Sequence, residues 1–355
     1  MNKNKDKVRI GISIGDIAGI GMEVIIKACM DNRILNTITP IVYGDSNLAK
    51  FYRKEINIHD FSFNPIKSAD LANPKRVNIV NVAAERINLS FGKSTKDTGA
   101  MALKSLEMAT KDLAANKIDA LVTAPIDKNA IQSEGFDFPG HTEYLANMSN
   151  VSEALMLMIE DNLRVGVVTG HVPLNEVASH ISEELILRKL NLLNRSLIND
   201  FEIVKPKIAV LALNPHASDH GLIGDEEEKI IIPAIEEANE QGILTFGPYS
   251  ADGFFGQGNY KNFDAILAMY HDQGLVPFKT LAAKGGVNYT AGLPIVRTSP
   301  AHGTAFDIAG KGIADESSFR EALFTAYDIF VAQKKIKEWT ANPLEKTNPK
   351  TMGKV

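Results

Sequence analysis

The chain has 355 residues, 38 Lys and Arg against 43 Asp and Glu (net charge −5), and an ordinary globular share of 45% hydrophobic residues. Its scattered cations argue against nucleic-acid binding, and no apolar run approaches the ~20 residues of a membrane span. The single cysteine, Cys29, excludes internal disulfides and cysteine-ligated metal clusters. The basic start lacks a small-residue cleavage site, so we expect no signal peptide and a cytoplasmic protein.

Short β-branched runs recur along the chain, each followed by a loop with glycine or proline. They predict strands over 8–14, 118–124, 163–169, 207–213 and 264–270. Amphipathic patterns predict helices over 97–117, 183–198 and 225–241. This alternation indicates an α/β fold with parallel sheets. The length exceeds one typical core of about 100–150 residues, so we expect two domains.

Histidines are concentrated in the loops that follow these strands. Five of the eight have glycine or proline as an immediate neighbour, namely His141, His171, His216, His220 and His302. Ligands of open parallel sheets bind at the carboxyl ends of strands, and loops carry most sites. The histidines therefore lie where such a fold would place its chemistry.

Three histidines, His171, His216 and His271, each follow a predicted strand within a few residues. Three imidazoles that leave one position open are a common catalytic arrangement for a divalent metal. Asp252 and Asp272 are candidates for further ligands or for partners that orient the imidazoles. The alternative is three unrelated loop histidines, each satisfied by the backbone.

Two further segments carry groups that suit an anion. His141 and Thr142, in FPGHTEYLA, predict a helix start that could bind phosphate or carboxylate, although a plain cap is the simpler role for Thr142. Lys279, Asn288 and Arg297 lie in LVPFKTLAAKGGVNYTAGLPIVRTSP, where Arg297 ends a short predicted strand. An arginine beside hydroxyl groups suits phosphate or carboxylate, with solvated surface charge as the alternative.

Other motifs are less specific. Asp127 and Lys128, in TAPIDKN, follow a strand and could line a site, although a helix start is the simpler interpretation. The segment HGTAFDIAGKG (302–312) is not the dinucleotide-binding G-x-G-x-x-G, and turns alone do not explain the whole string. No G-x-S-x-G or H-E-x-x-H motif occurs, so nothing indicates a serine nucleophile or a zincin.

Taken together, several ordered strings resemble one family. GHTEYLA, TGHVPL, LNPHASDHG, MYHDQGLVPFK and GVNYTAGLPIVRTSPAHGTAFDIAG are similar to the 4-hydroxythreonine-4-phosphate dehydrogenases, NAD-dependent enzymes of pyridoxal 5′-phosphate synthesis. The resemblance runs from the first strand to about Gly312. It departs from the family in the first loop, GDIAGIGME, where Asp16, Ile17 and Met22 replace the Glu, Pro and Pro that members commonly show.

The resemblance implies roles for particular residues. By it, the ligands of a divalent cation (zinc, cobalt or magnesium) are His171, His216 and His271. The implied substrate contacts are His141, Thr142, Lys279, Asn288 and Arg297. The 302–312 loop is very similar to a cofactor loop of decarboxylating dehydrogenases, so the implied NAD contacts are His302, Gly303, Asp307 and Gly310.

The implied architecture is two α/β/α domains around a cleft, as in isocitrate and isopropylmalate dehydrogenases. We expect residues 1–140 plus 275–355 to form the cofactor-side domain. Residues 141–274 would form the second domain, with the metal ligands and the dimer contacts. The family resemblance further implies a homodimer that shares its active site, with no nucleic-acid or membrane partner.

The implied reaction is a metal-dependent oxidation of 4-phosphooxy-L-threonine by NAD. It gives 2-amino-3-oxo-4-(phosphonooxy)butanoate, which decarboxylates to 3-amino-2-oxopropyl phosphate. Paralogues that oxidise 4-phospho-threonate or 4-phospho-erythronate are an alternative, because the matched residues do not separate these substrates. A three-histidine zinc hydrolase would not need the 302–312 loop, and a non-catalytic phosphate-binding module leaves the histidines unexplained.

Overall fold

The computed structural model describes residues 7–82, 89–132, 135–138, 140–282 and 285–343. Its strands are β1 (Val8–Ser13), β2 (Ile38–Gly44), β3 (Asn64–Ile66), β4 (Asn78–Asn81), β5 (Ala120–Thr123), β6 (Leu155–Glu160), β7 (Leu163–Thr169), β8 (Lys207–Leu211), β9 (Leu244–Tyr249), β10 (Ala265–Tyr270), β11 (Val287–Ala291) and β12 (Arg297–Pro300). They form one sheet in the order β3-β4-β2-β1-β5-β12-β11-β6-β7-β10-β8-β9. The predicted α/β class is confirmed, and the five predicted strands are β1, β5, β7, β8 and β10.

The sheet consists of two parallel blocks that run in opposite directions. The first block contains β3, β4, β2, β1, β5 and β12, and the second contains β7, β10, β8 and β9. Between them, the β12–β11, β11–β6 and β6–β7 pairings are antiparallel. Three reversals in succession turn the second block against the first. The carboxyl ends of the strands therefore do not all meet at one edge, as a single parallel sheet would require.

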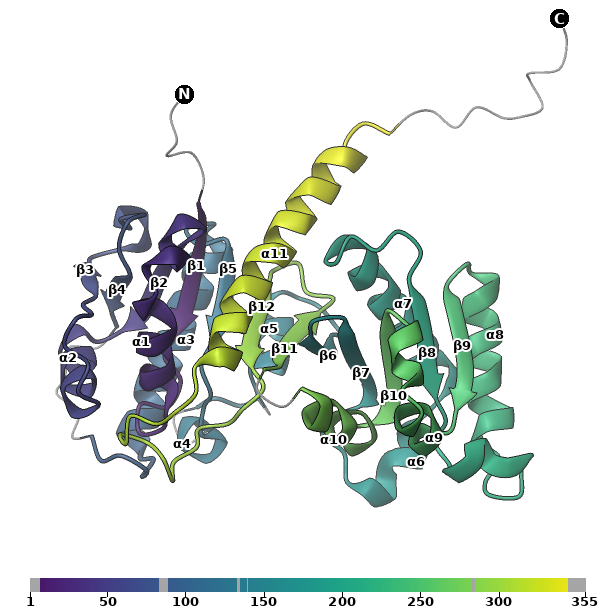
Figure 1. The fold of residues 1–355 in the computed structure, drawn as a ribbon. Helices are drawn as coiled ribbons and strands as arrows, with labels where there is room; N and C mark the ends of the chain where they lie inside the picture. The colour runs from purple at the N-terminus through teal and green to yellow at the C-terminus, as the bar shows by residue number, and fades with distance from the viewer. Residues whose placement is uncertain (1–6, 83–88, 133–134, 139, 283–284, 344–355) are drawn as a thin grey trace, which may run out of the picture.

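Helices cover both faces of this sheet (Figure 1). They are α1 (Gly21–Met30), α2 (Ser46–Glu55), α3 (Lys96–Ala114), α4 (Lys128–Gln132), α5 (His141–Met148), α6 (Val177–His180), α7 (Glu183–Asn199), α8 (Ile232–Glu240), α9 (Ala251–Gly256), α10 (His271–Leu281) and α11 (Ser317–Thr340). The predicted helices correspond to α3, α7 and α8, and the last begins with a π-helical turn at Glu227–Ile231. None of the described helices is long and apolar enough to cross a membrane.

One face of the sheet is covered by a continuous apolar core that includes residues of α1, α7, α8 and α11. The long helix α11 packs across β1, β5, β12 and β11, and so bridges the middle of the sheet. The opposite face carries two separate apolar clusters. One lies under α3, α4 and α5, and the other under α9 and α10.

The segment 287–300 returns late in the chain to the centre of the sheet, where β12 pairs with β5 and β11 pairs with β6. The sheet is continuous through these strands. The domain boundaries expected from the sequence, 1–140 plus 275–355 and 141–274, stay a prediction.

Candidate active site

A pocket of about 460 Å³ lies over the middle strands, on the face that carries two separate clusters. Its floor comes from side chains that the strand register places on one face. Asn288 of β11 is paired with both Ser299 of β12 and Met158 of β6. Arg297 of β12 and Thr123 of β5 also line this floor. The walls come from the loop after β5, the start of α5, the loop after β7, and α10.

The pocket brings together most of the residues predicted from the sequence. Its lining includes His141, Thr142, His171, His271, Lys279, Asn288, Arg297, His302 and Gly303. Three residues with implied roles are not part of this lining, His216, Asp307 and Gly310, and neither are the further candidates Asp252 and Asp272. Residues far apart in the sequence thus meet in one place, while the predicted metal and cofactor sets are only partly assembled there.

Arg297 is a buried cation, with 3% of its surface exposed. Its Nε and Nη2 donate to Thr123 Oγ1 at 3.1 and 2.6 Å, and its Nη1 donates to Thr290 Oγ1 at 3.2 Å. Burial lowers its pKa to about 10, so it stays charged at neutral pH. Contrary to expectation, β12 begins rather than ends at Arg297. Its described hydrogen bonds all go to hydroxyl groups, and Glu143 is a carboxylate whose charge acts on it without a direct ion pair. A buried cation held in this way favours a bound anion.

His141 and Thr142 occupy the first turn of α5, with Gly140 before them. The helix has no side-chain cap, so the role of a plain cap for Thr142 is wrong, and its Oγ1 lies 3.5 Å from Thr290 Oγ1. His141 Nε2 is buried without a described partner. Burial, together with Arg297 and Lys128, holds the pKa of His141 well below its usual range, so the ring is neutral.

His171 and His271 face each other across the pocket, with ring centres 6.0 Å apart. Burial is the main cause of the lowered pKa of His171, followed by the charge of Lys128. His271 Nδ1 lies 2.7 Å from Asp272 Oδ1 and donates to that carboxylate. When the ring is neutral, this contact leaves the Nε2 lone pair for a ligand. Neutral imidazoles are suitable ligands for a divalent metal, and a carboxylate in contact with the other ring nitrogen is the kind of partner that orients them; that role of Asp272 stays a prediction.

His216 is exposed and lies outside this pocket. It opens a run of five residues in the left-handed region, with φ between 46° and 66° from His216 to His220. Such backbone costs ~1 kcal/mol or more per residue and persists mainly at functional sites. Within the described residues of one chain, no group of three or more His, Cys, Asp or Glu is placed to hold a metal ion.

The 302–312 loop packs against the first glycine loop. Ile20 N donates to Thr304 O at 2.9 Å, and a side chain at Gly19 would meet that same oxygen at 2.6 Å. His302 Nε2 is buried without a described partner, whereas Asp307 is exposed. Gly310 packs against the ring of Phe91, with φ 75°.

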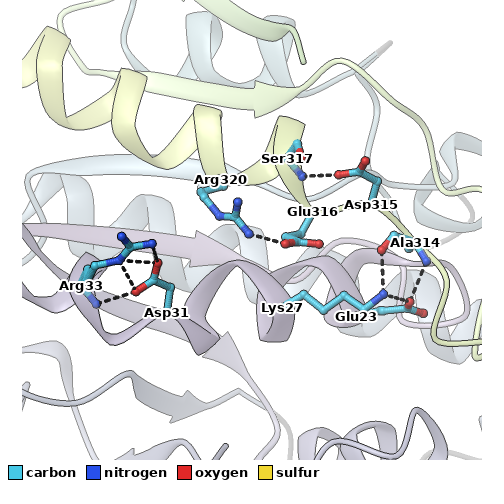
Figure 2. A network of polar contacts seen from close by, with 9 residues as sticks. All are labelled: Glu23, Lys27, Asp31, Arg33, Ala314, Asp315, Glu316, Ser317 and Arg320. Atoms are coloured by element: carbon cyan, nitrogen blue, oxygen red, sulfur yellow. Dashed lines mark hydrogen bonds and ion pairs between the residues drawn. The ribbon is translucent and has the colours of Figure 1, made fainter. Parts of the chain in front are cut away.

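The end of the same loop is held by α1 (Figure 2). Lys27 Nζ donates to the carbonyls of Gly312 and Ala314 at 2.9 and 2.7 Å. The fully buried Glu23 accepts from Lys27 Nζ at 2.9 Å and from Ala314 N at 2.8 Å. This contact, the Glu23–Lys27 clamp, fixes the loop relative to α1.

The sequence analysis underestimated Lys128 on the wall of the pocket and hydroxyl side chains on its floor. Lys128 lines the wall, although the sequence favoured only a helix start for it, and it is indeed the first residue of α4. Ser299 was expected only as a hydroxyl neighbour of Arg297, and Thr123 was not proposed as a site residue. The signal for Thr123 is its position at the end of a predicted strand.

The fold and the pocket define an α/β enzyme that binds a small anionic substrate. The family described as "Pyridoxal phosphate biosynthetic protein PdxA" matches residues 36–326. A "4-hydroxythreonine-4-phosphate dehydrogenase" of Bacteroides thetaiotaomicron is 50% identical over 343 residues, 96% of this chain and 94% of that one. The chain therefore belongs to the PdxA family of pyridoxal phosphate biosynthetic proteins, and it is a dehydrogenase.

Two further relatives agree in fold and enzyme class. A "D-threonate 4-phosphate dehydrogenase" of Cupriavidus necator is 39% identical over 322 residues, 88% of this chain and 95% of that one. The crystal structure of a 4-hydroxythreonine-4-phosphate dehydrogenase from Klebsiella pneumoniae superposes with a TM-score of 0.79 at 32% identity, covering 93% of this chain and 99% of that one. The predicted family and fold class are confirmed.

Proposed function

We propose that this dehydrogenase oxidises 4-phosphooxy-L-threonine with NAD and a divalent metal. The product, 2-amino-3-oxo-4-(phosphonooxy)butanoate, then loses CO₂ to give 3-amino-2-oxopropyl phosphate. The observation that carries the proposal is the buried Arg297, which has only hydroxyl partners on the floor of a pocket beside two facing imidazoles. A phosphate group supplies the missing counter-charge, and a guanidinium binds it through two parallel hydrogen bonds.

The phosphate end is expected to bind at the floor of the pocket. Arg297, Asn288 and Ser299 lie on neighbouring strands and present donors on one face. The first turn of α5 adds free backbone N–H groups, and its N-terminal end favours negative charge. His141 is held neutral there, so it can contribute a hydrogen bond to the substrate without adding charge.

The donor set fits a divalent cation in part. His171 and His271 are ligands of the right kind, and His216 of a second copy is the proposed third, in a homodimer that shares its sites. Exposed apolar side chains accompany each histidine in sequence and support an interface there: Leu174, Leu222 and Val276 are 73%, 81% and 59% exposed. When bound, the metal supplies Lewis acidity and the nicotinamide supplies a hydride acceptor.

The 302–312 loop is the proposed NAD site, with His302 and Gly303 on the substrate pocket. The buried His302 Nε2 has no described partner and so favours a hydrogen-bonding ligand, and the close approach of Gly19 to Thr304 holds this loop in place. Asp307 and Gly310 remain proposed contacts in the outer part of the loop. We expect the enzyme to work in the cytoplasm, where its single cysteine stays reduced.

The test is NADH formation by purified enzyme with 4-phosphooxy-L-threonine, before and after chelation and with zinc, cobalt or magnesium added back. We expect activity that chelation abolishes and a metal restores, together with release of CO₂. Parallel assays use 4-phospho-D-threonate and 4-phospho-D-erythronate, because one relative carries the D-threonate name. A higher kcat/KM for either would move the assignment to that substrate, and hydrolysis without NAD would refute it.

A further inference from the structure

We propose that Lys128 is a substrate-binding residue that holds the carboxylate of the substrate, the group that leaves as CO₂. This inference rests on the proposed function and adds a residue to it. It starts from the charges that line the pocket. Among the described lining residues there are three cations, Arg297, Lys279 and Lys128, and one carboxylate, Glu143.

Lys128 has no ion-pair or hydrogen-bond partner in the described structure, although Asp127 is its neighbour. Asp127 instead caps α4, because its Oδ1 accepts from Ala130 N at 2.8 Å. A cation at the N-terminal end of a helix is unfavourable, so local helix stability does not account for the lysine. An exposed, unpaired ammonium on a pocket wall is available to a ligand.

The backbone that carries Lys128 is tightly held. Ala124 N donates to Ser13 O at 3.0 Å, and Asp16 N donates to Pro125 O at 2.9 Å. Gly15 adopts φ 64°, and a side chain there would meet Pro125 O at 2.2 Å. The first glycine loop thus positions the loop after β5, and with it the start of α4.

The position of Lys128 points to the carboxylate rather than the phosphate. In 4-phosphooxy-L-threonine, the carbon that bears the reacting hydroxyl lies between the carboxylate end and the phosphate end. Arg297 and its neighbouring donors suit the phosphate, which has three oxygens to satisfy. Lys128 stands on the pocket wall at the start of α4, not among the strand residues of the floor that carry Arg297 and its donors, and so it is placed to meet the other end of the substrate.

The test compares two ligands that differ by the carboxylate. Binding of 4-phosphooxy-L-threonine and of 3-amino-2-hydroxypropyl phosphate, which lacks only the carboxylate, is measured by calorimetry on metal-loaded enzyme without NAD, so that no oxidation occurs. We expect Lys128→Met to weaken the carboxylate-bearing ligand roughly ten- to a hundredfold, and the other ligand less than about twofold. Lys128→Arg, which keeps the charge, should restore most of the affinity.

Lys50→Met, an exposed lysine on α2, is the matched control and should change neither ligand. Lys128→Gln repeats the test if Lys128→Met unfolds. Equal weakening of both ligands, or no weakening of either, would overturn the proposal. If the wild type binds only 4-phospho-threonate, the substrate given in the proposed function is wrong. That ligand also carries a carboxylate, so the Lys128 variants can still be tested with it.

Discussion

The pocket combines one buried cation with histidines whose ring nitrogens are buried. Arg297 stays charged because hydroxyl groups of Thr123 and Thr290 accept its hydrogen bonds. His141 and His302 have lowered pKa values, mainly through burial, and stay neutral. This arrangement concentrates positive charge on a few residues of a chain whose net charge is −5. Replacing Arg297 or His141 should therefore have a measurable effect on substrate binding or on stability.

Replacing Arg297 by Met should raise KM for the phosphorylated substrate roughly a hundredfold, because a buried, hydrogen-bonded charge contact is worth about 2–5 kcal/mol. Arg297→Lys should recover part of this loss, since an ammonium lacks the planar fork. Arg164→Met is the control: this half-buried arginine lies 4.6 Å from the centre of the Phe201 ring, outside the pocket. Steady-state kinetics decides, and an unchanged KM and kcat for Arg297→Met would rule out the anchoring role.

His141 should make the metal-free protein less stable in acid. In the unfolded chain this histidine titrates near its ordinary pKa of 6.5, whereas in the fold the value is lower. Below pH 6.5 the unfolded state therefore binds a proton that the folded state does not. The free energy of unfolding should fall with decreasing pH by up to ~1.4 kcal/mol per pH unit from this residue.

Urea unfolding of wild type and His141→Gln between about pH 7.5 and 5.5 measures this effect. The variant should lose less stability on acidification than the wild type. The exposed His59→Gln, distant in sequence and outside the pocket, should behave as wild type. Equal pH dependence in His141→Gln and wild type would contradict a neutral buried His141.

At the scale of elements, the loops of the site are held by residues that belong to recognisable sequence motifs. The sequence alone did not show what these residues contact. The sequence showed GDIAGIGME and HGTAFDIAGKG as unusual strings, but not that they contact each other. Glu23 and Lys27 lie one helical turn apart, a spacing typical of a surface pair. In the structure they bind the end of a loop nearly 300 positions further on, which no local pattern encodes (Figure 2).

Lys27→Met should lower stability by about 3 kcal/mol, because it leaves the buried Glu23 carboxylate without its cation. It should also raise KM for NAD more than KM for the phosphorylated substrate, since the clamp holds the proposed cofactor loop. The double variant Glu23→Gln/Lys27→Met should regain much of the stability. Denaturant unfolding and steady-state kinetics are the measurements.

Lys229→Met provides the comparison, because its ion pair with Asp225 also spans one helical turn but is exposed. It should cost less than about 1 kcal/mol and leave both KM values unchanged. If Lys27→Met were as mild as Lys229→Met, the clamp would have no role in holding the loop.

At the scale of the whole molecule, apolar runs predicted β1, β5, β7, β8 and β10, but not the polar strands at the centre of the sheet. The run 163–169 coincides with β7, because a strand buried on both faces is apolar throughout. The central strands β11 and β12 are buried but polar, with Asn288, Thr290 and Arg297 among their residues. Their side chains form the pocket floor, so function overrides the apolar pattern.

The strand order also could not be predicted, and it decides the metal site. His171 and His271 follow β7 and β10, which are neighbours, whereas His216 follows β8, beyond β10. All three histidines follow a strand end, yet only His171 and His271 lie at the pocket. In the proposed homodimer, His216 of one copy would complete the site of the other, which would account for the exposure of this third histidine.

Mixing two inactive variants tests this sharing. His216→Ala and His171→Ala should each lose metal affinity and turnover, because each removes one of three ligands. After denaturation and joint refolding, half of the dimers are mixed, and one of the two sites in each is intact. Roughly a quarter of the wild-type activity should return if the site is shared. No recovery, with mixed dimers verified by mass spectrometry, would place all three ligands within one chain.

The late return of residues 287–300 to the centre of the sheet bears on synthesis of the protein. Until the ribosome has made them, β5 lacks its neighbour β12 and β6 lacks its neighbour β11. The nascent chain therefore carries two open strand edges, which favour pairing with other chains. Completion of the sheet waits for the last quarter of the polypeptide. Chains truncated before residue 287 should aggregate rather than yield a folded amino-terminal fragment, and this protein should depend on chaperones that shield such edges during translation.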